Sequence, residues 1–308
     1  QTVFDLTNAQ MGNLTAAYAS LAVPGYLISG WVADKFNSKK LMLIAVFSTD
    51  AVVFIMATIP SYPVLLVLFF CMSITLGLLF WSAMEKLIRM FGEAGEQGTI
   101  RGVYQGVDGI MSLGLMVGLA ALLGERLSTP SGMRILLLVF GVIYLLSGIG
   151  FLVTFKYDDF ASEYLVDTGE PVKLKNYVVA AKMPAMWIVS IMSFGVYITS
   201  TAFNYVNPYM VNMYAMPAAL AAIYGILLRY GIKIVAAPVG GVIRDKIGNT
   251  TRMVIYTALP SLLLVLVFMF IPKSANWTLA AVAVSLIFTF IYRMGNNLCS
   301  VPFAELDV

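Results

Sequence analysis

Residues 30–40 read GWVADKFNSKK, and residues 241–252 read GVIRDKIGNTTR. Both stretches contain Gly-x-x-x-Asp-Lys, followed by a turn residue and then by a basic residue. Each stretch follows one long apolar run and precedes another. A single basic turn between membrane helices commonly reflects only membrane orientation. Two copies at matching positions indicate an internal repeat, which is typical of transporters.

The composition around these two stretches is that of a membrane protein. Of the 308 residues, 60% are hydrophobic and 11% are charged, whereas soluble domains carry about 25% charged residues. A membrane helix needs about 20 largely apolar residues, and the apolar runs do not alternate as the strands of a barrel would. We therefore predict nine membrane helices, at residues 13–33, 41–59, 62–84, 102–123, 133–155, 186–206, 217–242, 253–271 and 277–298.

Basic residues alternate between the links that join these runs. Each odd-numbered link holds three or four Lys or Arg residues, and each even-numbered link holds between none and two. Because cytoplasmic loops are enriched in Lys and Arg, we expect the odd-numbered links to face the cytoplasm. Gln1 would then start outside the membrane, and Val308 would end inside.

The residue types exclude several classes of function. The chain contains no His, which excludes imidazole metal sites and His-based acid–base chemistry. Cys71 and Cys299 both lie in apolar runs and are interpreted as small packing residues. No phosphate-binding loop with Lys-Ser/Thr and no nucleophile–base pair is present. We expect neither an enzyme nor a metal site, and neither a cofactor nor a nucleic-acid partner.

The duplicated stretch resembles the signature loop of the major facilitator superfamily, which follows the second and eighth helices of that family. Asn37 stands where the family usually has Gly. In this register the chain holds family helices two to ten, so nine of twelve helices of an all-α polytopic fold with two bundles. The resemblance implies an amino-terminal bundle at residues 1–155, a central cytoplasmic loop at 156–183 and a carboxy-terminal bundle at 184–308. Helices one, eleven and twelve would be absent.

Further short stretches are similar to bacterial permeases near the sugar-phosphate and organophosphate branch of the family. They comprise Phe80-Trp81, Glu96-Gln97-Gly98 with Gly102, and Tyr205-Val-Asn-Pro-Tyr209. That similarity implies a phosphorylated or acidic sugar derivative as the substrate.

The resemblance also implies a gating role for the duplicated motif. The Asp of each copy would sit near the amino end of a helix from the other bundle, where the helix dipole favours an anion. Asp245 would meet the region 98–101, whereas Asp34 would meet a helix that is absent. The alternative is a purely structural role, in which these residues only terminate helices. The motif residues are Gly30, Asp34, Lys35, Lys39, Lys40, Gly241, Asp245, Lys246 and Arg252.

Charged residues inside the predicted helices mark a candidate substrate site, since intramembrane charges are costly and usually functional. Arg229, Lys233 and Arg293 lie in the carboxy-terminal half, which has no acid deep in its predicted spans. Asp108 could pair with one of them or carry a coupling proton. The alternative is that the basic residues pair only for structural reasons. The predicted substrate-binding residues are Arg229, Lys233, Asp108, Arg293, Tyr104, Tyr197 and Asn204.

The predicted helices also contain a row of glycines and one further acid, Asp50. Gly98, Gly102, Gly106, Gly114 and Gly118 recur at mostly four-residue spacing, which predicts a close-packing face and not a nucleotide loop. Asp50 also lies near the middle of its predicted helix, and no role is assigned to it.

Together these observations predict a secondary transporter that moves a small organic anion by alternating access, driven by a proton or by phosphate exchange. We expect a multi-pass, monomeric protein of the bacterial inner membrane, surrounded by the lipid bilayer. The alternative is a transporter-like receptor that binds its ligand and signals without transport. A large cytoplasmic partner surface would favour the receptor, but the central loop is short.

Overall fold

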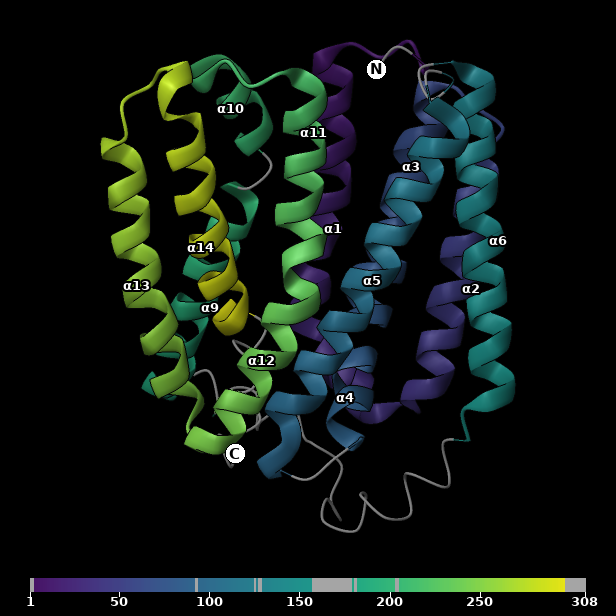
Figure 1. Cartoon of the computed structure of the whole chain (residues 1–308). Coiled ribbons are helices and arrows are strands. Elements are labelled where there is room, and N and C mark those ends of the chain that lie inside the picture. The colour runs from purple at the N-terminus through teal and green to yellow at the C-terminus, as the bar shows by residue number, and fades with distance from the viewer. Residues whose placement is uncertain are drawn as a thin grey trace. The chain divides into compact units, whose positions relative to one another are not determined.

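The computed structural model describes residues 3–91, 94–124, 126, 129–156, 179, 182–202 and 205–296. Its secondary structure is helical, with no strand in these ranges (Figure 1). Six helical spans are long and apolar enough to cross a membrane. α1 (Asn8–Lys35) is a seventh if its two bent halves form one span. The prediction of an all-α polytopic fold is therefore confirmed.

The helices follow the predicted apolar runs and extend beyond most of them by up to six residues. α2 is not one of the six spans, and Lys39, Lys40 and Asp50 all lie within it. The remaining elements are α2 (Ser38–Met56), α3 (Tyr62–Met72), η1 (Ser73–Phe80), α4 (Trp81–Met90), η2 (Ala94–Glu96), α5 (Gln97–Leu123), α6 (Pro130–Thr154), α9 (Pro184–Ala202), α10 (Val206–Tyr214), α11 (Ala218–Ile226), η6 (Leu227–Gly231), α12 (Ile232–Ile247), α13 (Thr250–Phe270), η7 (Ala275–Trp277) and α14 (Thr278–Asn296).

Two of the long spans contain π-helical segments, in which the backbone turns are wider than in an α-helix. The segment η1 joins α3 to α4, and η6 joins α11 to α12. Hydropathy does not distinguish a π-turn from an α-turn, so neither segment was predictable from the apolar pattern. π-turns are rare and often occur at functional sites.

The chain forms two compact units. The first comprises Gln1–Phe91 and Gly118–Leu174, and the second comprises Gly92–Val117 and Lys175–Val308. Most of α5 therefore packs with the carboxy-terminal helices. The division into bundles at residues 155 and 184 stays a prediction.

Both copies of the duplicated motif form a tight turn between two helices. In the first copy, the Asn37 side chain accepts a hydrogen bond from the Lys40 backbone N–H (3.2 Å) and caps α2. In the second, Gly248 adopts a left-handed conformation (φ 65°), and the Asn249 side chain accepts from Arg252 N–H (2.9 Å) to cap α13. Asn is a favoured capping residue, which explains why Asn37 can replace the usual Gly.

In the first unit, α2 and α6 pack against each other and lie side by side (Figure 1). The rings of Phe47 and Phe54 lie against Gly148 and Gly141, where a Cβ atom would be crowded. A basic side chain also joins the helices at each end. Lys39 donates to the carbonyl oxygens of Leu152 (3.0 Å) and Phe155, whereas Arg134 Nε donates to Ala57 O (3.2 Å). Each helix thus receives a cation at its carboxyl end, where the dipole favours positive charge. The pair forms a closely packed edge of the unit.

In the second unit, α12 packs closely against both α5 and α14. A Cβ atom at Gly102 would lie 2.6 Å from Ala237 O, and one at Gly106 would lie 2.9 Å from Pro238 Cγ. Gly240 approaches the Met294 backbone of α14 in the same way. Earlier in the same span, Tyr224 of α11 forms a hydrogen bond with Ser285 of α14. These contacts fix the position of α12 between its two neighbours.

The predicted glycine face on α5 is shorter than expected. Gly98, Gly102, Gly106 and also Gly109 contact the helix that ends at Ile247. A Cβ atom at Gly114 or Gly118 would have no atom of the described residues within 4 Å. Close packing therefore ends about midway along α5.

Candidate functional site

A polar stripe runs along α5 beside its glycine face. Arg101, Gln105, Asp108 and Ser112 follow each other at intervals of four, three and four residues. This spacing places their side chains on one side of an α-helix. The stripe therefore carries polar groups along the edge of the α5–α12 contact.

The central contact of the site is an ion pair between Lys233 and Asp108. Lys233 Nζ donates to Asp108 Oδ2 and lies 3.4 Å from Gln105 Oε1. The Lys233 side chain is 9% exposed, whereas the Asp108 side chain is 44% exposed. The acid is thus open to approach from outside the helix pair, while the base is held between α5 and α12.

Arg229 and Arg293 lie close to this pair. Arg293 of α14 is buried, and its Nη2 donates to the Arg229 carbonyl oxygen (3.2 Å). Its charge also interacts with Arg229, Tyr230 and Asp108. The Arg229 side chain is exposed, with its guanidinium carbon 5.6 Å from the centre of the Tyr230 ring. The structure therefore gathers Arg229, Lys233, Arg293 and Asp108 within one unit.

The π-helical segment η6 contributes to this arrangement. Arg229 lies within η6, where the Ile232 backbone N–H bonds the Leu227 carbonyl five residues earlier. Wider turns disturb the regular backbone ladder, so a carbonyl in such a segment can accept a bond from another helix. Arg293 makes such a bond to Arg229.

Asp245 lies at the amino end of α5. Its carboxylate accepts backbone hydrogen bonds from Gly98 N (3.0 Å to Oδ1) and Thr99 N (2.6 Å to Oδ2). Arg244 Nη1 donates to Asp245 Oδ1 (2.8 Å), and Arg244 Nε donates to Thr250 Oγ1 (2.8 Å). A carboxylate at this position meets unpaired N–H groups and the positive end of the helix dipole. The contact lies in the region that the family resemblance implies.

Gly241 allows this close approach of α12 to α5. The position that a Cβ atom of Gly241 would take overlaps the Gly98 carbonyl oxygen, so only Gly fits without a shift. Lys246 and Arg252 are exposed. Arg244, which lies between Gly241 and Asp245, is a buried charged residue of the second motif copy. Its positive charge in the sequence indicated only membrane orientation.

The first motif copy makes different contacts. Asp34 lies 3.8 Å from Lys86 of α4, and Lys86 also donates to Ala33 O (2.9 Å). Lys35 lies over the Trp31 ring at 4.9 Å. Gly30 is half-buried, and Lys40 is exposed. The predicted gating role of both copies remains a prediction.

Of the aromatic and amide residues predicted for the site, the structure describes the side chain of Tyr104. Tyr104 lies half-buried on α5. Tyr197 falls within the bounds of α9, but its side chain is outside the described part, as is the whole of Asn204. The structure brings Gln105 and Tyr230 into the cluster instead. Gln105 was recognisable from its place one turn before Asp108, whereas Tyr230 depends on the π-turn.

An apolar pocket lies elsewhere in the second unit. It has a volume of about 350 Å³ and involves α10, α13 and α14. Its lining comprises Tyr205, Val206, Tyr209, Leu228, Leu264, Val265, Phe268, Met269, Ser285 and Phe288. None of these residues is charged, so the pocket lacks the groups that an ionic substrate needs.

The arrangement can bind an anion. Its three cations exceed the single negative charge of Asp108, and a guanidinium can bind carboxylate or phosphate through two parallel hydrogen bonds. Among the described residues, no group of three or more His, Cys, Asp or Glu could hold a metal ion.

Comparisons with known proteins agree with this architecture. The family model described as Major Facilitator Superfamily matches residues 1–305. The chain is 26% identical to inner membrane protein YqcE of Escherichia coli (strain K12) over 253 residues, covering 80% of this chain and 59% of YqcE. It is 23% identical to inner membrane protein YihN of the same organism, covering 100% of this chain and 74% of YihN. The chain thus spans less than two thirds of the length of YqcE.

Proposed function

The chain belongs to the major facilitator superfamily, and we propose that the protein moves a small organic anion across the membrane by alternating access. It is a multi-pass protein of the bacterial inner membrane. Membership of a transporter family supports transport without chemical conversion of the substrate. Family membership supports transport, whereas the negative charge of the substrate is inferred from the residues of this chain.

The excess of positive charge around Asp108 is the observation that carries the proposal. Lys233 pairs with Asp108, and Arg229 of η6 and Arg293 of α14 bring two further positive charges to the same site. Burying cations in a membrane protein is costly, and an anionic substrate would offset that cost. Arg229 is the exposed member and would make the first contact.

The similarity to the sugar-phosphate and organophosphate branch favours a sugar phosphate or sugar acid as the substrate. A proton or exchanged phosphate would drive transport. Asp108 is the residue that would carry a coupling proton, because its protonation would release Lys233 for the substrate. We assign the second motif copy to gating, through the bonds of Asp245 to the amino end of α5.

Uptake by the whole protein in proteoliposomes tests the proposal. The substrates are radiolabelled sugar phosphates, sugar acids and neutral sugars, each with and without a pH gradient. We expect saturable uptake of an anion, lost in Arg229→Gln and retained in Arg126→Gln, which changes an exposed Arg outside the cluster. Binding without uptake would favour a receptor, and uptake of neutral sugars alone would contradict the anion site.

A second experiment tests the gating role. Asp245→Asn keeps the size of the side chain but removes the charge that Gly98 N, Thr99 N and Arg244 bind. Bonds to a charged acceptor contribute about 1.5–3 kcal/mol, so we expect a roughly tenfold or larger shift between outward- and inward-open states. Unchanged uptake and unchanged state preference would exclude the role.

A further inference from the structure

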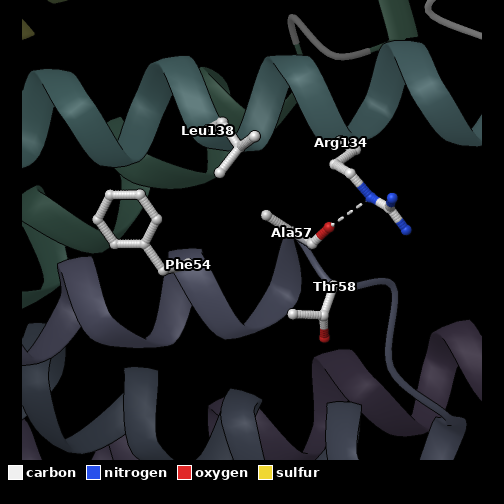
Figure 2. A pocket seen from close by; sticks show the side chains of 5 residues that line it. All are labelled: Phe54, Ala57, Thr58, Arg134 and Leu138. Atoms are coloured by element: carbon white, nitrogen blue, oxygen red, sulfur yellow. Dashed lines mark hydrogen bonds between the residues drawn. The ribbon is translucent and has the colours of Figure 1, made fainter.

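A pocket opens between the end of α2 and the start of α6 in the first unit. It has a volume of about 350 Å³ and is lined by Phe54, Ala57, Thr58, Arg134 and Leu138 (Figure 2). Phe54 is held by its contact with Gly141 of α6. The pocket therefore belongs to the closely packed edge formed by α2 and α6.

The lining changes from polar to apolar along the helix axes. Arg134 and Thr58 lie at the helix ends, because α2 ends at Met56 and α6 begins at Pro130. Phe54 and Leu138 lie about one turn, or roughly 5 Å, further into the helices. The pocket thus runs from polar groups at the ends of the two helices to apolar side chains further along them.

Arg134 uses only part of its hydrogen-bonding capacity within the protein. Its Nε donates to Ala57 O (3.2 Å), which fixes the guanidinium at the mouth of the pocket (Figure 2). A guanidinium has five N–H donors, and in the described part of the chain only this one bond is formed. Arg134 is exposed, and its two terminal nitrogens lie in one plane, which suits two oxygens of a phosphate.

We propose that this pocket binds an anionic phospholipid, with its phosphate on Arg134 and an acyl chain along Phe54 and Leu138. Charge complementarity selects the anion, because none of the five lining residues is acidic. The Thr58 hydroxyl donates to Ile55 O (2.7 Å), so its oxygen can accept a bond from a headgroup hydroxyl. The apolar wall selects a lipid, since a free phosphate would leave the accessible surfaces of Phe54 and Leu138 uncovered.

A basic residue near the end of a membrane helix often only caps a neighbouring helix. Capping the carboxyl end of α2 explains the Nε bond of Arg134. It does not explain the pocket or the two terminal nitrogens that face away from Ala57 (Figure 2). On the predicted orientation, Arg134 also lies on the outer side, where few basic residues occur and the positive-inside rule gives it no role.

Native mass spectrometry of the purified protein tests the proposal. The probes are phosphatidylglycerol and phosphatidylcholine at equal concentrations, with inorganic phosphate as a soluble competitor. We expect preferential binding of phosphatidylglycerol, weakened at least about tenfold in Arg134→Gln because bonds to a charged group are lost. Arg126→Gln is the matched control and should bind as the unchanged protein does.

A second variant separates lipid binding from loss of the helix cap. Leu138→Glu leaves the bond from Arg134 to Ala57 in place but puts a negative charge in the path of the acyl chain. Because Leu138 is exposed, we expect the variant to fold and to lose the preference for phosphatidylglycerol. Equal binding of both lipids, undiminished binding in both variants, or full displacement by inorganic phosphate would overturn the proposal.

Discussion

Asp50 lies midway along α2, between the two Phe residues that pack on α6. It is 5% exposed, and its Oδ1 has no hydrogen-bond partner in the described part of the chain. A buried polar atom without a partner costs about 1–3 kcal/mol. We therefore expect Asp50→Leu to raise the free energy of unfolding by a similar amount.

Thermal unfolding in detergent micelles would measure this effect. A lower melting temperature in Asp50→Leu would mean that the carboxyl group makes a stabilising contact. If the variant is more stable but transports less, Asp50 is kept for function at the expense of stability.

At the same scale, the pair formed by Lys233 and Asp108 predicts energetic coupling. Asp108→Asn leaves the buried Lys233 without its anion, and Lys233→Gln removes the cation itself. The two changes together should cost less than the sum of the single changes, with a coupling of about 0.5–3 kcal/mol. A double-mutant cycle by chemical unfolding measures this quantity. Strict additivity would show that the ion pair contributes nothing to stability.

At the scale of elements, the contact between α5 and α12 depends on glycines in only half of α5. Gly102→Ala places a methyl group 2.6 Å from Ala237 O and should destabilise the protein by about 1–3 kcal/mol. Gly114→Ala is the matched control on the same helix. Its methyl group meets no described atom within 4 Å, so the better helix propensity of Ala should stabilise by up to about 1 kcal/mol.

Melting temperatures of the two variants decide this prediction. Equal effects of Gly102→Ala and Gly114→Ala would contradict the observed helix contact. If both substitutions lowered the melting temperature, the packing face would extend to Gly114, as the glycine spacing alone predicted.

The sequence was sufficient to predict the helices, because apolar length in a membrane leaves few alternatives. It also placed the two turns, since each copy of the motif has a turn residue, Asn37 or Gly248, between two long apolar runs. Arg229, Lys233 and Asp108 were expected to form one site because charges inside membrane helices are costly and usually functional. Their positions relative to each other were not predicted. The short helix α10 (Val206–Tyr214) was missed, because nine residues that include Asn207, Pro208 and Asn212 do not form an apolar run of membrane length.

Contacts between distant segments could not be read from the pattern. Arg244 looked like an orientation signal, yet it is buried against Asp245 and Thr250. Gly109 falls outside the four-residue spacing but packs on α12. Both depend on which helix lies opposite, and no local property of the sequence specifies that partner.

At the scale of the whole molecule, the distribution of basic residues predicts the orientation in the membrane. Lys40 and Lys273 are exposed and lie in links on opposite predicted sides. In a protein whose Cys71 and Cys299 are replaced by Ser, we expect Lys273→Cys to react with an impermeant maleimide on intact cells. Lys40→Cys should react only after the membrane is permeabilised. The reverse pattern would invert the topology.

The π-helical segment η6 also sets the angular phase between two parts of one membrane span. Tyr224, before the segment, reaches Ser285 on α14, whereas Lys233, after it, reaches Asp108 on α5. Each residue of an α-helix advances the rotation by about 100°. Deleting one residue from η6 would therefore turn Lys233 and the whole second motif copy away from α5, while Tyr224 kept its direction. The wide turns act as a fixed offset, so the length of this span is under constraint even where its residue types are not.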